Sequence, residues 1–179
     1  MIDLQESKTK VFINFDVQDA NVVEVKKPEE PDVMTFANHF DSPDVRGKID
    51  RLEGMMRQHE AVPIETRHHF AKGLYAREIF IPKGTLLTGK IHKHEHLNIV
   101  SKGEISVLTE DGPQRVKAPC TIVSRPGTKR VGYAHEDTVW TTIHATNETD
   151  VEKIEAEMIA ASYEEYLAFI APALEDKGD

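Results

Sequence analysis

A run of ionisable side chains, KIHKHEH, occupies residues 90–96. Side chains in a β-strand alternate between two faces, so Lys90, His92, His94 and His96 share one face wherever the strand is regular. One face therefore collects a lysine and three histidines. Neutral imidazole is the commonest metal ligand in proteins and lysine offers a point positive charge, so the run indicates a binding site.

The run lies within a longer pattern of regularly placed residues that begins and ends at a glycine. Gly84 is followed by five residues and then Lys90, His92 comes two positions later, His96 follows after three more residues, and Gly103 after another six. This spacing resembles the first sequence motif of the cupin superfamily, G-x5-H-x-H-x3-E-x6-G, at every step. Two residue types differ, since Lys90 stands at the place of the first histidine and His96 at the place of the glutamate.

The second cupin motif, P-x-G-x2-H-x3-N, is approximated by RPGTKR at residues 125–130. Arg130 stands at the place of the histidine and Ala134 at the place of the asparagine. The resemblance covers about residues 70–145. It implies an all-β fold with flanking helices, namely the cupin-type double-stranded β-helix or jelly-roll barrel. The chain is similar to small cupin-like proteins of unassigned function from bacterial virus genomes.

In cupins the motif residues, three histidines and a glutamate, hold one metal ion inside the barrel. Carried over to this chain, the motif leaves only His92 and His96 with side chains that bind metals. Protein sites for divalent ions have three or four protein ligands, so a third ligand is needed, from His94, His135 or His144. We expect His92, His96 and His144 to hold one divalent ion (Zn, Fe, Mn or Ni), because His144 ends a predicted strand that could run past the pocket.

Lys90 and Arg130, at two former ligand positions, would bring positive charge into the barrel. Arginine binds carboxylate or phosphate with two hydrogen bonds, and lysine acts as a point charge. The sequence therefore predicts a small anionic ligand, such as a sugar acid, a nucleotide or a phosphate ester, with Tyr133 beside it. The alternative is that both cations face solvent. Trp140 is either a core residue or a platform for the ligand.

Two functions fit these features. The first is a small-molecule-binding cupin-like protein, and as a metal-dependent enzyme it would act on a small anionic substrate. The second is a non-catalytic homodimer or higher homo-oligomer, a structural or interaction module with a degenerate pocket. The sequence assigns no catalytic residue and no reaction.

The elements that must position these residues are short strands separated by glycine, proline and aspartate turns, a pattern typical of a β-sandwich or barrel. We expect the barrel over 71–146, with strands near 74–81, 86–92, 96–100, 104–109, 114–118, 120–124, 131–134 and 138–145.

The flanking segments differ from the barrel in pattern. Residues 1–34 are expected to form an extended arm, with strands at 11–17 and 21–25 that could join a sheet edge of this chain or of a partner. Residues 35–70 form a helical lead-in, with a helix over 42–60 capped by Ser42. Residues 147–179 form two helices, one capped by Asp150 and one that opens at Ser162 and ends before Pro172; their many acidic residues are expected to face solvent.

Composition excludes several classes of partner. The formal net charge of −9 argues against a nucleic-acid or anionic-membrane surface, since such surfaces need excess lysine and arginine. No apolar run is long enough to span a membrane. Cys120, the single cysteine, cannot form an internal disulfide, and together with the absence of a secretory pattern this favours the cytoplasm.

Overall fold

The structure is a computed structural model that describes residues 9–13, 24–25, 44–59 and 64–175. Its elements in chain order are β1 (Thr9–Ile13), β2 (Glu24–Val25), α2 (Val45–Met56), β3 (Thr66–Ala71), β4 (Leu74–Ile81), β5 (Thr85–Thr88), β6 (Ile91–His92), β7 (His96–Lys102), β8 (Glu104–Thr109), β9 (Gly112–Lys117), β10 (Cys120–Ser124), β11 (Val131–Ala134), β12 (Thr138–Ala145), α3 (Val151–Met158), β13 (Ile159–Ala160) and α4 (Tyr163–Glu175).

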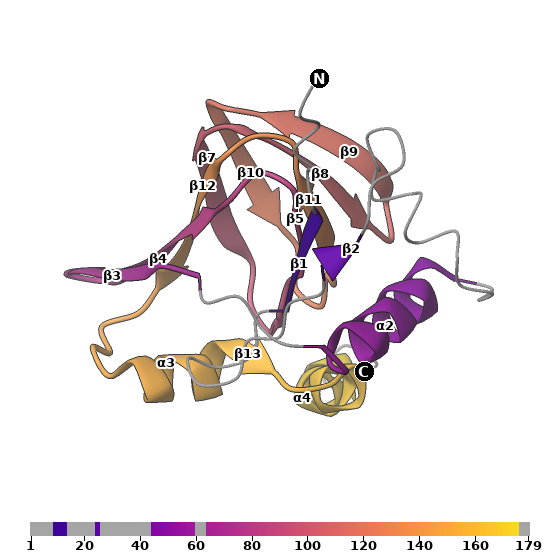
Figure 1. Ribbon diagram of the computed structural model, residues 1–179. Helices are drawn as coiled ribbons and strands as arrows, with labels where there is room; N and C mark the ends of the chain where they lie inside the picture. Colours follow the sequence, from indigo (N-terminus) through magenta and orange to yellow (C-terminus); the bar gives the residue numbers. More distant parts are fainter. Residues whose placement is uncertain (1–8, 14–23, 26–43, 60–63, 176–179) are drawn as a thin grey trace, which may run out of the picture.

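Two sheets face each other and enclose the interior of the barrel (Figure 1). One sheet has the order β2-β1-β5-β11-β8-β9 and the other β10-β7-β12-β4-β3. From β4 to β12 the chain passes back and forth between the sheets, with β8 and β9 as a hairpin in one of them. Eight strands ordered β5-β11-β8-β9 against β4-β12-β7-β10 form a jelly roll, the architecture that cupins share. The predicted fold class is confirmed.

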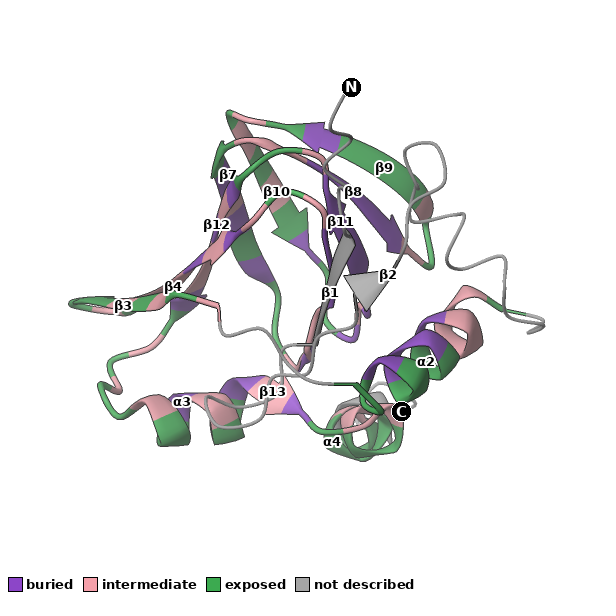
Figure 2. Cartoon of the chain, viewed as in Figure 1, coloured by how far each residue is buried: buried purple, intermediate pink, exposed green. Residues whose placement is uncertain are grey.

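The strand pattern follows from alternating side chains. In β4 the inward residues Tyr75, Ile79 and Ile81 are buried, and in β12 Trp140 and His144 are buried. Figure 2 shows buried residues along strands of both sheets. The apolar core fills the space between the sheets, with Ile79, Ile81, Leu87, Val100, Ile105, Val107, Val116, Ala134 and Trp140. Apolar and polar inward residues on the same strands therefore divide the interior between a core and a site.

The strands before β7 differ in part from the expected ones. The expected strand over 86–92 is broken at Gly89 and Lys90 into β5 and β6, since β6 leaves the sheet of β5 and pairs with β13 of the C-terminal segment. Residues 66–71 form an additional strand, β3, which pairs with β4 as a hairpin. In the N-terminal arm, β1 pairs in parallel with β5 of its own chain and β2 pairs with β1. The remaining parts of the expected strands at 11–17 and 21–25 lie outside the described residues.

Helix α2 packs one apolar face on the barrel, with Ile49, Leu52 and Met56 buried. Its N-cap is Asp44, whose carboxylate accepts the Gly47 N–H. The prediction of Ser42 as the cap was wrong, because the chain turns helical two residues later and Asp44 supplies the oxygen.

The C-terminal segment closes over one end of the barrel (Figure 1). Asp150 caps α3, as expected, by accepting the N–H groups of Glu152 and Lys153. Ser162 Oγ accepts the Glu165 N–H at the start of α4. The prediction that this helix ends before Pro172 was wrong: α4 runs to Glu175 with the proline inside it. Proline removes only one backbone donor there, in the last turn of the helix. Within the described residues, no helix is long and apolar enough to cross a membrane.

Candidate metal and ligand site

Three histidines from three strands converge inside the barrel. One ring nitrogen each of His92, His96 and His144 lies within 4.8 Å of the others. The ring centroids are 4.1 Å apart for His92 and His96, and 5.0 Å apart for each of the other two pairs. Three imidazoles at this separation can reach one ion together, because a zinc–nitrogen bond is about 2.0–2.1 Å long.

Each histidine is held by a different pairing of strands. His92 ends β6, which pairs with β13 of the C-terminal segment at Ile159. His96 begins β7 opposite Ser124 of β10, and His144 in β12 lies opposite Tyr75 of β4. The triad therefore depends on contacts from the second sheet and from the C-terminal segment alike.

The hydrogen bonding of the rings leaves nitrogen lone pairs directed at the site. His96 Nδ1 lies 3.1 Å from the backbone carbonyl oxygen of His94, which can only accept, so Nδ1 carries the proton and Nε2 has the lone pair. His92 Nδ1 and His96 Nε2 are buried, and neither has a hydrogen-bond partner among the described residues. Buried polar atoms in native proteins are nearly always satisfied, so these two orphaned nitrogens fit a bound metal ion.

Burial also keeps the imidazoles neutral. Desolvation lowers the pKa of His144 to about 4, with a smaller repulsion from the neighbouring His96. The pKa of His92 is well below its usual value of 6.5 for the same two reasons, desolvation first and neighbouring histidines next. Desolvation lowers the pKa of His96 as well. Neutral imidazole is the form that binds a metal, so the triad is ready to bind at neutral pH.

The triad opens onto a cavity of about 110 Å³ between the two sheets. Ile79, Ile81, Leu87 and Trp140 of the core form part of its wall, and Ile154 and Met158 of α3 close one side. The charged residues of the lining are Arg77, Lys90, Arg130 and Glu155. Cations outnumber anions in this lining, although the whole chain is acidic.

The two predicted cations both line the cavity, but in different surroundings. Lys90 Nζ lies 3.2 Å from Glu155 Oε2 of α3, and both side chains are mostly buried. Arg130 Nη2 donates to Ser124 Oγ at 2.7 Å. The alternative that these two side chains face bulk solvent is therefore wrong, because the C-terminal segment and β10 cover them.

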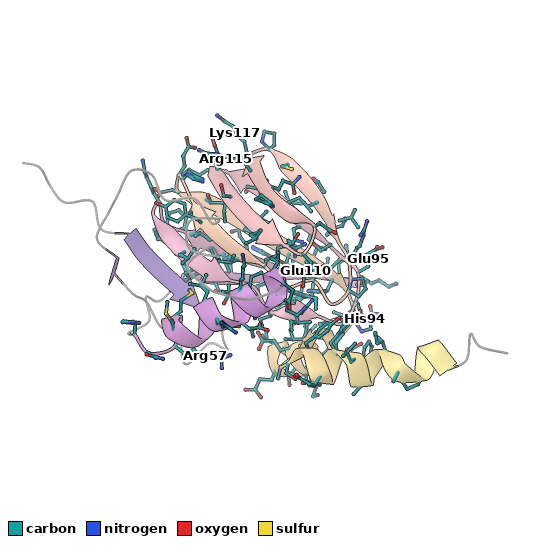
Figure 3. All side chains as sticks on the ribbon, turned by 90° about the vertical axis from the view of Figure 1, so that its right-hand side faces the viewer. Arg57, His94, Glu95, Glu110, Arg115 and Lys117 are labelled. Atoms are coloured by element: carbon teal, nitrogen blue, oxygen red, sulfur yellow. The ribbon has the colours of Figure 1, made fainter. Side chains whose placement is uncertain are left out.

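Three other candidates from the sequence lie outside the triad or the cavity. Tyr133 is buried but does not line the cavity, since the strand alternation that turns Gly132 inward turns Tyr133 away; its ring packs edge-on against His135. His135 Nε2 lies 2.7 Å from Ser106 Oγ. His94 is exposed and packs edge-on against Phe169 of α4, and Figure 3 shows it between the barrel and the C-terminal helices.

The sequence did not single out the polar residues that surround Arg130. Asn98 and Ser124 are buried, with 2% and 0% of their surface exposed, and Thr142 lines the cavity beside them. The alternation of β7 and β12 contained a signal, since Asn98 shares a face with His96 and Thr142 shares a face with His144. Glu155 had no such signal, because it comes from an acidic helix that was expected to face solvent.

No protein-family model matches the chain, and no curated protein matches it. Similar solved structures include KdgF from Halomonas sp., at 18% identity over 49% of this chain and 83% of that one, with a TM-score of 0.42. Ectoine synthase from P. lautus is 14% identical over 54% of this chain and 74% of that one, with a TM-score of 0.45. An RmlC-like cupin from Shewanella frigidimarina is 15% identical over 50% of this chain and 80% of that one, with a TM-score of 0.42.

These similarities concern the fold alone, and the expected similarity to proteins of bacterial virus genomes stays a prediction. The strand order carries the assignment of the fold independently of them, because the two sheets have the jelly-roll order and the motif residues of 84–103 run through β5, β6 and β7. The chain therefore has the double-stranded β-helix fold of the cupins.

Proposed function

We propose that this protein binds one divalent metal ion through His92, His96 and His144, and binds a small anionic molecule in the adjoining cavity. The observation that carries the proposal is the set of three neutral, convergent imidazoles with two orphaned buried nitrogens. Three protein ligands are the usual set of a catalytic zinc site, which keeps a further position open for water or substrate.

A metal ion in this position would supply Lewis acidity and a template for an oxygen-bearing ligand. The residues of the chain do the rest of the work. The His94 carbonyl oxygen fixes the tautomer of His96, so that Nε2 carries the lone pair that would bind the ion. The apolar residues of the wall, among them Ile79 and Ile81, keep bulk water from one side of the ligand.

The cations of the lining favour an anion in the cavity. Arg130 and Lys90 both line it, and with Arg77 they outnumber the one carboxylate of the lining, Glu155. A cavity of about 110 Å³ supports a small ligand, since an engineered cavity of about 150 Å³ holds one benzene molecule. A nucleotide is far larger than this, so the size favours the smaller of the anions that the sequence suggested. A cavity of this size is also an argument against the degenerate pocket of the alternative function.

Metal analysis of protein purified without a histidine tag tests the proposal. We expect about one equivalent of a divalent metal, either as purified or after titration of zinc, manganese, iron(II) or nickel into chelator-treated protein. Replacing any one of His92, His96 and His144 by alanine should weaken binding by roughly 10- to 100-fold or more, since each removes one of three ligands. His94→Ala is the matched control and should leave binding unchanged. Less than a tenth of an equivalent in all of these titrations would contradict the proposal.

A further inference from the structure

The polar side chains around Arg130 form a chain of hydrogen bonds with only one possible direction. Trp140 Nε1 donates to Asn98 Oδ1 at 2.9 Å, and Thr142 Oγ1 donates to the same oxygen at 2.8 Å. An indole nitrogen can only donate, so the carbonyl oxygen of Asn98 must face Trp140. The amide nitrogen of Asn98 must then face Ser124, and it donates to Ser124 Oγ.

Ser124 is the point where this chain meets the arginine. Its hydroxyl oxygen accepts from Asn98 Nδ2 and from Arg130 Nη2, which uses both of its lone pairs. Asn98 and Ser124 are almost fully buried, at 2% and 0% exposure, so neither can exchange these partners for water. The guanidinium of Arg130 is thus held by a buried group whose own orientation is fixed by three further side chains.

Arg130 has no counter-ion of its own among the described residues. Among those residues, the only hydrogen bond of its guanidinium is the one to Ser124, and no carboxylate forms an ion pair with it. Glu110 and Asp111 act on it only from a distance, and each is paired with another arginine, Arg46 and Arg125 respectively. Removing a guanidinium from water without a partner is unfavourable, so an anion in the cavity would complete this arrangement.

The second predicted cation differs in this respect. Lys90 already faces the carboxylate of Glu155 at 3.2 Å, within the same cavity wall. Its charge is therefore balanced by the chain itself, and an anion that approached it would also meet the negative charge of Glu155.

We propose that Arg130, positioned by Ser124 and Asn98, is the receptor for a carboxylate group of a small ligand, and that Lys90 is not. The planar fork of an arginine matches the two oxygens of a carboxylate, and a guanidinium fixed in advance loses less freedom on binding. The cavity of about 110 Å³ limits the ligand to about four or five non-hydrogen atoms. This proposal rests on the proposed function for its site, but it concerns the anion and not the metal.

Propionate is a suitable probe, and propionamide is its matched neutral analogue. Trp140, the only tryptophan, donates to Asn98, so its fluorescence reports on the site. We expect saturable binding of propionate and at least tenfold weaker binding of propionamide and of inorganic phosphate. Titrations are made on zinc-loaded and on chelator-treated protein in parallel.

Four variants separate the roles of the residues. Arg130→Gln should weaken propionate binding about 30-fold or more, and Arg130→Lys, which keeps the charge without the fork, should weaken it about tenfold. Ser124→Ala should weaken it about fivefold, and Ser124→Thr, which returns the hydroxyl, should restore it. Zinc content and the midpoint of urea unfolding are measured on each variant, so that loss of binding is distinguished from loss of fold.

Two further variants serve as controls. Arg125→Gln removes an exposed arginine of the same loop and should leave propionate binding unchanged. The double variant Lys90→Met/Glu155→Gln removes both charges of this pair and should change propionate binding less than threefold. Loss of binding in this double variant with normal binding in Arg130→Gln would overturn the proposal, and so would tighter binding of phosphate than of propionate.

The outcomes also separate this proposal from the proposed function. Zinc bound by the triad with no saturable propionate binding would overturn the carboxylate receptor alone. Propionate binding that depends on Arg130 in a protein that binds no metal would support the receptor and contradict the metal site.

Discussion

The neutral histidine triad makes the metal-free protein less stable in acid, and the size of the effect follows from His144. The native state holds the pKa of His144 at about 4, whereas the unfolded chain has the ordinary value of 6.5. The unfolded chain therefore binds a proton that the native state refuses. This contribution to stability is complete above about pH 6.5 and is lost as the pH falls toward about 4.

The magnitude is accessible to an equilibrium measurement. For His144 alone, the free energy of unfolding should fall by about 2 kcal/mol between about pH 7.5 and about pH 5, and by roughly 3 kcal/mol near pH 4. Solvent screening reduces this effect only slightly, because His144 is only 5% exposed. The lowered pKa values of His92 and His96 act in the same direction.

Urea denaturation of chelator-treated protein, followed by the fluorescence of Trp140, measures this free energy. His144→Leu removes the titrating group and should remove about 2 kcal/mol of the difference between the two pH values. His59→Ala removes an exposed histidine outside the barrel; it is the matched control and should keep the wild-type difference. Zinc should raise the free energy of unfolding more at the higher pH, because protons compete for the same nitrogens.

Two results would refute this reasoning. One is a metal-free wild-type protein whose stability is equal at both pH values or greater at the lower one. The other is a His144→Leu variant with an undiminished pH dependence. Either would mean that the three rings are solvated in the native state, and the basis for a preformed metal site would be lost.

Two further predictions concern the residues that support the barrel. Gly103→Ala should lower the free energy of unfolding by about 2–4 kcal/mol in urea denaturation. Gly103 has φ +84°, and an added Cβ would collide with the backbone of Asp137. A loss of less than about 0.5 kcal/mol would contradict this close approach. Lys129→Met should cost about 3–5 kcal/mol, because Lys129 Nζ lies 2.8 Å from Glu53 Oε2 with both side chains buried. Adding Glu53→Leu to this variant should restore most of the lost stability in the same assay. If stability did not recover, the unpaired charge of Glu53 would not be the cause of the loss.

The fold could be predicted from the sequence because its signals are local. The turn glycines Gly84 and Gly103 both adopt positive φ. In β7, which lies between them, the side chains alternate between a buried and a more exposed face as the sequence periodicity indicates. The motif spacing likewise placed His92 and His96 on the inner side of one pocket. Helix ends were less predictable, as Ser42 and Pro172 show, since a cap depends on which oxygen reaches the first free N–H groups.

The choice among candidate histidines depended on geometry that spacing does not contain. His94 has the parity of His92 and His96, yet it is exposed, because the chain bends over residues 93–95 between β6 and β7 and the alternation is interrupted. His144 joins the triad through the pairing of β12 with β7, a contact between distant parts of the sequence. A regular strand would have turned His94 inward.

The C-terminal segment was the largest omission from the predicted site. Its acidic residues have the composition of a solvated surface, and most of those whose burial the structure describes are exposed. Glu155, however, lies in the cavity wall, and Tyr166 of α4 packs so closely on Gly127 of the second motif that any side chain there would overlap its ring. A segment placed by long-range packing contributes to the site without any local motif.

The exchange of residues within the motif changes the charge of the whole site. The cupin motif that residues 84–103 resemble includes a glutamate ligand, whose negative charge would offset part of the charge of a divalent ion. The triad of this chain is neutral, so a bound divalent ion would give the site a net charge of about +2. Lys90 and Glu155 balance each other, and Arg130 adds a further positive charge without a counter-ion among the described residues. Metal and carboxylate should therefore each favour the binding of the other, in addition to any direct bond between them.

The coupling between the two ligands can be measured. Zinc should tighten propionate binding at least about fivefold, the lower end of ordinary coupling between sites, and propionate must then tighten zinc binding by the same factor. Arg130→Gln should weaken the binding of propionate without weakening that of zinc in the absence of the anion, because it removes a positive charge that acts on His92 and His96. Independent or competitive binding of zinc and propionate would show that the two charges are not near enough to act on one ligand, even if each site exists separately.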